Sequence, residues 1–93
     1  MYGTIARVIA RPGTEEELRS LSQRLALAPG QIARYAYRMD ANPEEYFLVA
    51  VFESKEAYWA NAQDPQQHER FMELRALLQA DPEWHDGEIV DAG

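Results

Sequence analysis

The sequence has no cysteine, no long apolar run and few basic residues. The absence of cysteine excludes a disulfide and a thiolate metal site. No stretch approaches the roughly 20 apolar residues of a transmembrane helix. The first residues lack the basic and apolar regions of a signal peptide. We therefore expect a soluble, cytoplasmic protein without a membrane partner.

Basic residues are outnumbered by acidic ones, 9 to 16, which gives a formal net charge of −7. Non-specific affinity for nucleic acid comes from clustered Lys and Arg, and affinity for anionic membranes has the same origin. The predicted third strand also lacks the basic and aromatic signature of an RNA-recognition module. We expect no nucleic-acid partner.

The chain has five glycines and five prolines, and most of them stand where one element should end and the next begin. A length of 93 residues is typical of one domain, so we expect a single domain over residues 1–93. The breaks fall at Arg11-Pro12-Gly13, Pro29-Gly30, Asp40-Ala41-Asn42-Pro43, Asp64-Pro65 and Asp81-Pro82.

Between the breaks, apolar residues recur with the period of strands or of helices. The predicted strands are Tyr2–Arg11, Gln31–Met39, Tyr46–Glu53 and Glu83–Asp91. The predicted helices are Thr14–Ala28, a short one that Ser54 caps and that ends at Ala62, and one from Pro65 to about Ala80 that Asp64 caps. Thr14 and Glu17 have the spacing of a capping box.

The third strand has two apolar faces. Tyr46, Leu48, Ala50 and Phe52 alternate with Phe47, Val49 and Val51, so both faces must be buried. The element order β-α-β-β-α-β, with the second helical element divided, predicts an α+β, ferredoxin-like antiparallel sheet with all helices on one face. Since the other face stays apolar, we expect a second copy of the chain to cover it in a homodimer.

Two segments of the chain resemble the antibiotic biosynthesis monooxygenase family. The run Val51-Phe52-Glu53-Ser54-Lys55-Glu56-Ala57-Tyr58 is similar to its strand-to-helix junction. The opening Thr4-Ile5-Ala6-Arg7, with Arg11-Pro12-Gly13-Thr14-Glu15-Glu16-Glu17-Leu18, is similar to its first strand and helix. The resemblance implies a dimeric α+β barrel with a pocket between sheet and helices. It also implies oxygenation of a quinol or a polyketide-like phenol without a cofactor.

The haem-degrading members of that family offer an alternative, haem binding or degradation. Their Asn would fall at Ala6, which cannot donate to a ligand. Their Trp would fall near Asn61, two positions past Trp59, and their His near Phe71, past His68. A shift of two positions on a helix turns a side chain well away from its place. The sequence therefore disfavours this alternative.

Three residues are the predicted catalytic groups of a cofactor-free oxygenation, which needs a base and a donor to an oxyanion. His68 is the candidate base, because an imidazole titrates near neutrality; the alternative is an exposed residue at a helix start. Asn61 is the candidate oxyanion donor, at the position that faces the pocket in the family; the alternative is a helix C-cap. Arg75 is a candidate to orient a phenolate; the alternative is a surface ion pair.

Four aromatic residues are predicted to bind the ring of a substrate: Tyr35, Tyr37, Trp59 and Phe71. The alternative for each is ordinary core packing.

Neither His68 nor His85 belongs to a metal-ligand pattern, so we predict no metal and no other cofactor. The function hypothesis is a monooxygenase of small aromatic substrates, and the alternative is a protein of the same fold that binds a small molecule without catalysis.

Overall fold

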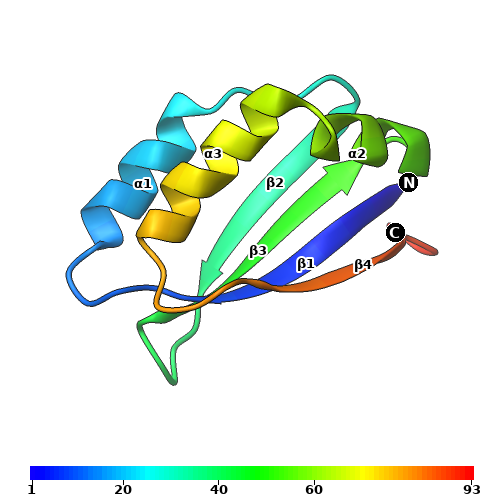
Figure 1. Cartoon of the computed structure of the whole chain (residues 1–93). Coiled ribbons are helices and arrows are strands. Elements are labelled where there is room, and N and C mark those ends of the chain that lie inside the picture. The colour runs from blue at the N-terminus through cyan, green and yellow to red at the C-terminus, as the bar shows by residue number, and fades with distance from the viewer.

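Four strands form one antiparallel sheet in the order β2-β3-β1-β4, and three helices lie on one side of it (Figure 1). The computed structural model describes all 93 residues. The α+β, ferredoxin-like prediction is confirmed, and β2 and β4 are the two edge strands. The elements are β1 (Tyr2–Ile9), α1 (Glu15–Arg24), β2 (Gln31–Arg38), β3 (Glu45–Phe52), α2 (Lys55–Ala62), α3 (Pro65–Ala76) and β4 (Glu83–Glu88). No helix is both long enough and apolar enough to cross a membrane.

The core lies between the helices and the even-numbered residues of β1 and β3. The strand register pairs Ala6 with Leu48 and Val8 with Tyr46, which places these side chains on the face that the helices cover. The buried apolar side chains are Ala6, Val8, Ala10, Leu21, Phe52 and Leu78. Only 9 of the 93 residues are buried, so the core of one chain is thin, as expected at this length.

The opposite face of the sheet, which we call the open face, carries the odd-numbered residues of the same strands. It includes Ile5, Tyr35 and Tyr37, which remain 49%, 56% and 54% exposed. Phe47 and Val49 lie between them on β3, at positions paired with Tyr37 and Tyr35. The predicted alternation of two apolar faces in the third strand is therefore present, and no helix covers the open face (Figure 1).

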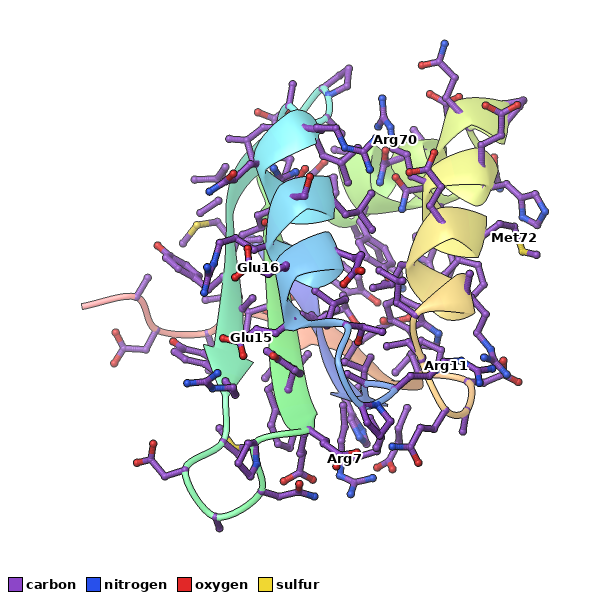
Figure 2. The ribbon with its side chains drawn as sticks, turned by 90° about the vertical axis from the view of Figure 1, so that its left-hand side faces the viewer. Arg7, Arg11, Glu15, Glu16, Arg70 and Met72 are labelled. Carbon is purple, nitrogen blue, oxygen red and sulfur yellow. The ribbon has the colours of Figure 1, made fainter.

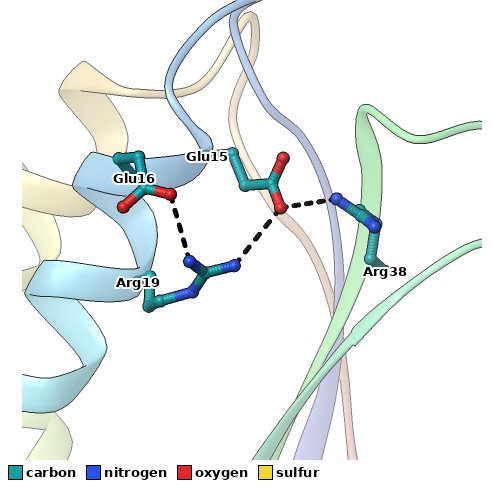
Figure 3. Close-up of polar contacts among 4 residues, drawn as sticks. All are labelled: Glu15, Glu16, Arg19 and Arg38. Carbon is teal, nitrogen blue, oxygen red and sulfur yellow. Dashed lines mark hydrogen bonds and ion pairs between the residues drawn. The ribbon is translucent and has the colours of Figure 1, made fainter.

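An ion-pair cluster joins the first turn of α1 to the end of β2. The Glu15 carboxylate lies 2.6 Å from Arg38 Nη1 and 3.4 Å from Arg19 Nη2, and Glu16 lies 3.0 Å from Arg19 Nη1 (Figure 3). Acidic groups at a helix start also complement the helix dipole. These side chains are half exposed or more, so each pair contributes little stability by itself.

Two of the three predicted helix caps are confirmed. Ser54 Oγ accepts the Ala57 backbone N–H at 3.1 Å, and Asp64 Oδ1 accepts the Gln66 N–H at 2.9 Å. The predicted capping box of Thr14 and Glu17 is wrong, because Thr14 makes no side-chain cap hydrogen bond. Its hydroxyl instead donates to the Arg11 carbonyl at 2.7 Å, because the preceding turn brings that acceptor closer than the helix brings its own donors.

The first helix ends at Arg24 rather than at the predicted Ala28. The cause is Arg34 on β2, whose guanidinium donates to the Ser22 carbonyl at 2.8 Å and also to the Leu25 carbonyl. A cation that satisfies the last carbonyls closes a helix. The sequence predicts that Arg34 lies in the second strand, but local spacing does not show that its side chain reaches the end of a helix.

The third helix ends at Ala76, before the predicted Ala80. The residues that follow turn toward the end of β1, where Leu78 forms an isolated bridge with Ala10 and is completely buried. The Gln79 N–H donates to the Ile9 carbonyl at 2.8 Å. Backbone pairing with β1 therefore replaces the last helical turn, and it also ends the regular part of β1 before the predicted Arg11.

The last strand also ends earlier than predicted, at Glu88 rather than at Asp91. Ile89 and Val90 belong to the predicted strand, yet both follow the observed one, and Val90 is 87% exposed. The register with β1 explains the difference, because Glu88 already pairs with Tyr2, the first residue of β1. Beyond this pair, the Ile89 N–H donates to the Met1 carbonyl at 2.9 Å, where the chain begins.

Candidate functional site

A hollow of about 370 Å³ lies between α2 and the turn that begins β2. Its size is within the range of small-molecule sites. Two backbone segments frame it, the Pro29-Gly30 turn and the junction from β3 to α2. The lining residues are Pro29, Gly30, Glu53, Ala57, Ala60, Asn61 and Asp64.

Asn61 is the one predicted catalytic residue that lines this hollow. It lies in the last turn of α2, and the C-cap of the helix is Gln63, so the C-cap alternative for Asn61 does not hold. Its backbone carbonyl accepts the Asp64 N–H at 3.1 Å, which fixes the main chain at this point. The residue is partly buried, and its amide group, which makes no hydrogen bond within the chain, is free to donate to a ligand oxygen.

Gly30 keeps the hollow open where the chain turns into β2. Its φ is +77°, a conformation that residues with a side chain rarely adopt. A Cβ at this position would lie 2.7 Å from Ala57 Cβ and 3.5 Å from Glu53 Oε1. The close approach of the turn to α2 therefore requires glycine, and it places the Glu53 carboxylate at the wall of the hollow.

His68 and Arg75 lie on α3, outside this hollow. His68 is exposed, four residues before Met72, and residues at that spacing share one face of a helix. Met72 points to solvent (Figure 2) and is 52% exposed. Arg75 Nε donates to Asp81 Oδ1 at 2.7 Å, and its Nη1 donates to the Leu78 carbonyl at 3.2 Å. Arg75 thus has the surface ion pair named as its alternative.

The four predicted ring-binding residues fall on two sides of the sheet. Trp59 and Phe71 lie in α2 and α3, on the helix side, whereas Tyr35 and Tyr37 lie on the open face. The sheet separates the two pairs, so they do not line one pocket in this chain. Phe71 faces Trp84 of β4, with ring centroids 6.1 Å apart.

Tyr58 is the centre of an aromatic cluster that the sequence analysis did not identify. Its ring centroid lies 5.3 Å from that of Tyr2, 5.4 Å from Phe52 and 5.2 Å from Trp59. Its hydroxyl donates to Asp86 Oδ1 at 2.8 Å, which links α2 to β4. Burial, with this hydrogen bond next in effect, raises the pKa of Tyr58 to about 12.

The sequence did contain a local signal for the Tyr58 cluster. Tyr58 follows Ser54 by one helical turn, and a helix that starts directly at the end of β3 brings its first turn over the sheet. The hydrogen-bond partner of the Tyr58 hydroxyl, Asp86, could not be predicted from local spacing. Asp86 lies 28 residues further along the chain, and only the pairing of β4 with β1 brings it close.

The fold defines a small α+β protein with one antiparallel sheet, a helical layer on one face and an uncovered apolar face. The sequence model of the antibiotic biosynthesis monooxygenase family matches residues 1–74, which is most of the chain. The chain belongs to this family. Comparison with the sequences of curated proteins gives no match.

Solved structures of related proteins have the same fold. A protein of Chloroflexus aurantiacus J-10-fl, classed with the antibiotic biosynthesis monooxygenases, is 22% identical with a TM-score of 0.81, and the match covers 99% of this chain and 95% of that chain. SnoaB of Streptomyces nogalater, a cofactor-independent oxygenase solved in a mutant form, is 19% identical with a TM-score of 0.83, over 98% and 94% of the two chains. At these identities the likeness establishes the fold.

Proposed function

We propose that this protein is a cofactor-independent monooxygenase of a small aromatic substrate, a quinol or a polyketide-like phenol. The observation that carries the proposal is the placement of Asn61, which lines a hollow of about 370 Å³ on a scaffold of this family and whose amide makes no hydrogen bond within the chain. Ala57 and Ala60 contribute apolar wall. Such a site can hold one aromatic ring with its oxygen toward the amide.

Asn61 would act as a donor to the substrate oxygen when that oxygen becomes an anion. A preorganised donor of this kind stabilises charge that develops in the transition state. The likeness to SnoaB, a cofactor-independent oxygenase, supports this chemistry as a proposal for the present chain.

Oxygen uptake with a panel of quinols and naphthols tests the proposed function. We expect at least one compound to be consumed faster than its uncatalysed oxidation, and we expect Asn61→Ala to lower kcat about 100-fold, the usual effect of removing one oxyanion donor. Met72→Ala, an exposed change on α3, is the control. No uptake above the uncatalysed rate with any compound would refute an oxygenase.

The positions of His68 and Arg75 favour a second candidate, a protein of this fold that binds a small molecule without catalysis. The predicted base is exposed on α3, and Arg75 is paired with Asp81. A compound from the same panel that raises the melting temperature without being consumed would support binding alone. If the protein consumes oxygen and Asn61→Ala abolishes that consumption, binding without catalysis is excluded.

A second copy of the chain is proposed to cover the open face. Ile5, Tyr35 and Tyr37 remain about half exposed there, and the core of one chain is thin. A contiguous apolar surface across three strands typically marks an interface, and a two-fold partner presents the same surface in return. Such a homodimer would bury the aromatic rings that the helices leave uncovered.

A further inference from the structure

The hollow beside α2 contains a carboxylate that no other group of the protein engages. Glu53 directly follows β3, and its Oε1 and Cδ lie at the wall of the hollow, next to Gly30. Its backbone N–H donates to the Gly30 carbonyl at 2.9 Å. The main chain of Glu53 is therefore held by the sheet, while its carboxylate stays available.

The second carboxylate of the hollow has a structural task. Asp64 Oδ1 accepts the Gln66 N–H and caps α3, so protonation of this group would weaken a helix start. Glu53 makes no such contact. The hollow thus has one uncommitted proton acceptor, Glu53, and one uncommitted amide donor, Asn61, from two adjacent elements.

We propose that Glu53 is the general base of this site, which accepts the phenolic proton of a substrate whose oxygen lies against Asn61. The inference rests on the proposed function and deepens it. It replaces His68 as the base, since His68 lies on α3 outside the hollow. A general base must be able to reach the proton that it removes, and Glu53 lines the same hollow as the amide that would bind the resulting anion.

The reaction balances with O₂ as the oxidant. The phenolic O–H bond breaks and its proton moves to Glu53. The phenolate then gives an electron pair to O₂, and a C–O bond forms at a ring carbon that carries hydrogen. Glu53 returns its proton to the peroxide, the O–O bond breaks, and the ring hydrogen leaves with the outer oxygen as water. The ring loses four electrons to become a quinone, and O₂ gains four.

The test compares Glu53→Gln with the wild type in oxygen uptake, over a range of pH and with the same quinols and naphthols. In the wild type, kcat/KM should fall toward acidic pH, because a protonated carboxylate cannot accept the proton. In Glu53→Gln, kcat should fall about 100-fold, the usual contribution of a general base. The acidic fall that Glu53 causes should also be replaced by a rate that follows the ionisation of the phenol itself over the whole pH range.

Glu56→Gln is the matched control, since Glu56, like Glu53, is an exposed carboxylate near the start of α2 but does not line the hollow. It should keep the wild-type rate and pH profile. Glu53→Asp, which keeps the charge on a shorter side chain, should be slower than the wild type and retain the acidic fall. Melting curves of each variant report on the fold independently.

Two outcomes contradict the proposal in different ways. If Glu53→Gln keeps the wild-type rate and the acidic fall, Glu53 is not the base, while the proposed oxygenase stands. If the wild type consumes no oxygen with any compound, the proposed function fails and the role of Glu53 fails with it.

Discussion

At the scale of single residues, the surroundings of Tyr58 set its ionisation. Its ring packs against Tyr2, Phe52 and Trp59, and its hydroxyl is bound to Asp86. A phenolate would lose water at this position and lie beside a carboxylate, so the neutral form is favoured and the pKa rises from 10.0 to about 12. At neutral pH the group is a stable hydrogen-bond donor.

The raised pKa of Tyr58 predicts a loss of stability at alkaline pH. Because the folded state holds this proton more tightly than the unfolded chain does, the loss is absent below about pH 10, and the free energy of unfolding falls as pH rises from about 10 to about 12. Urea melts along this pH series should show the fall in the wild type and a smaller one in Tyr58→Phe.

Ultraviolet titration gives a second test of the same pKa. A late ionisation step near pH 12 should appear, and Tyr58→Phe should remove that step. Tyr46→Phe is the control, because Tyr46 lies on the face of the sheet that the helices cover, and this variant should keep the late step. A late step that survives in Tyr58→Phe would contradict the assignment.

At the scale of elements, spacing within one turn predicted two of the three caps correctly and failed at Thr14, whose hydroxyl donates to the Arg11 carbonyl instead. Ser54 and Asp64 cap their helices as their sequence positions indicate. The ends of α1 and α3 were not predictable in this way. Arg34 closes α1 from a neighbouring strand, and the bridge between Ala10 and Leu78 replaces the last turn of α3. Both contacts join residues far apart in the sequence.

The hydroxyl of Ser54 caps a helix and that of Thr14 does not, so we expect alanine substitutions at the two positions to lower the free energy of unfolding by different amounts. Ser54→Ala should lower the free energy of unfolding by about 1 kcal/mol, because the Ala57 N–H loses its acceptor. Thr14→Ala should cost less, since its hydroxyl only donates to the exposed Arg11 carbonyl, which water can satisfy. Chemical denaturation of both variants measures the two costs side by side. Equal losses would contradict the assignment of the caps.

At the scale of the whole molecule, the two faces of the sheet differ in what covers them. The helices bury the even-numbered side chains of β1 and leave the open face exposed. The sheet therefore separates two sites: the hollow with Asn61 and Glu53 beside α2, and the aromatic surface of Tyr35 and Tyr37. The sequence grouped these tyrosines with Trp59 and Phe71, because aromaticity alone does not reveal which side of a sheet a residue occupies.

The exposed tyrosines predict the oligomeric state. Light scattering should give twice the chain mass of 10.7 kDa for the wild type, and the double variant Tyr35→Glu with Tyr37→Glu should give a monomer, because buried, unpaired carboxylates are costly at an interface. Met72→Glu introduces one carboxylate on an exposed residue of the helix side and should remain dimeric. A wild-type mass of one chain would contradict the homodimer.

The sequence by itself determined the order of the elements, the two apolar faces of β3, the caps at Ser54 and Asp64, and the candidate Asn61. These follow from local periodicity, from spacing within one helical turn, and from the family pattern around the junction at residues 51–58. Only the tertiary structure decided where the first and third helices end, which aromatic residues share a side, and that Asp86 meets Tyr58. It also showed that Glu53 lines the same hollow as Asn61. Each of these depends on strand pairing or on a close approach of backbone segments, which no local pattern encodes.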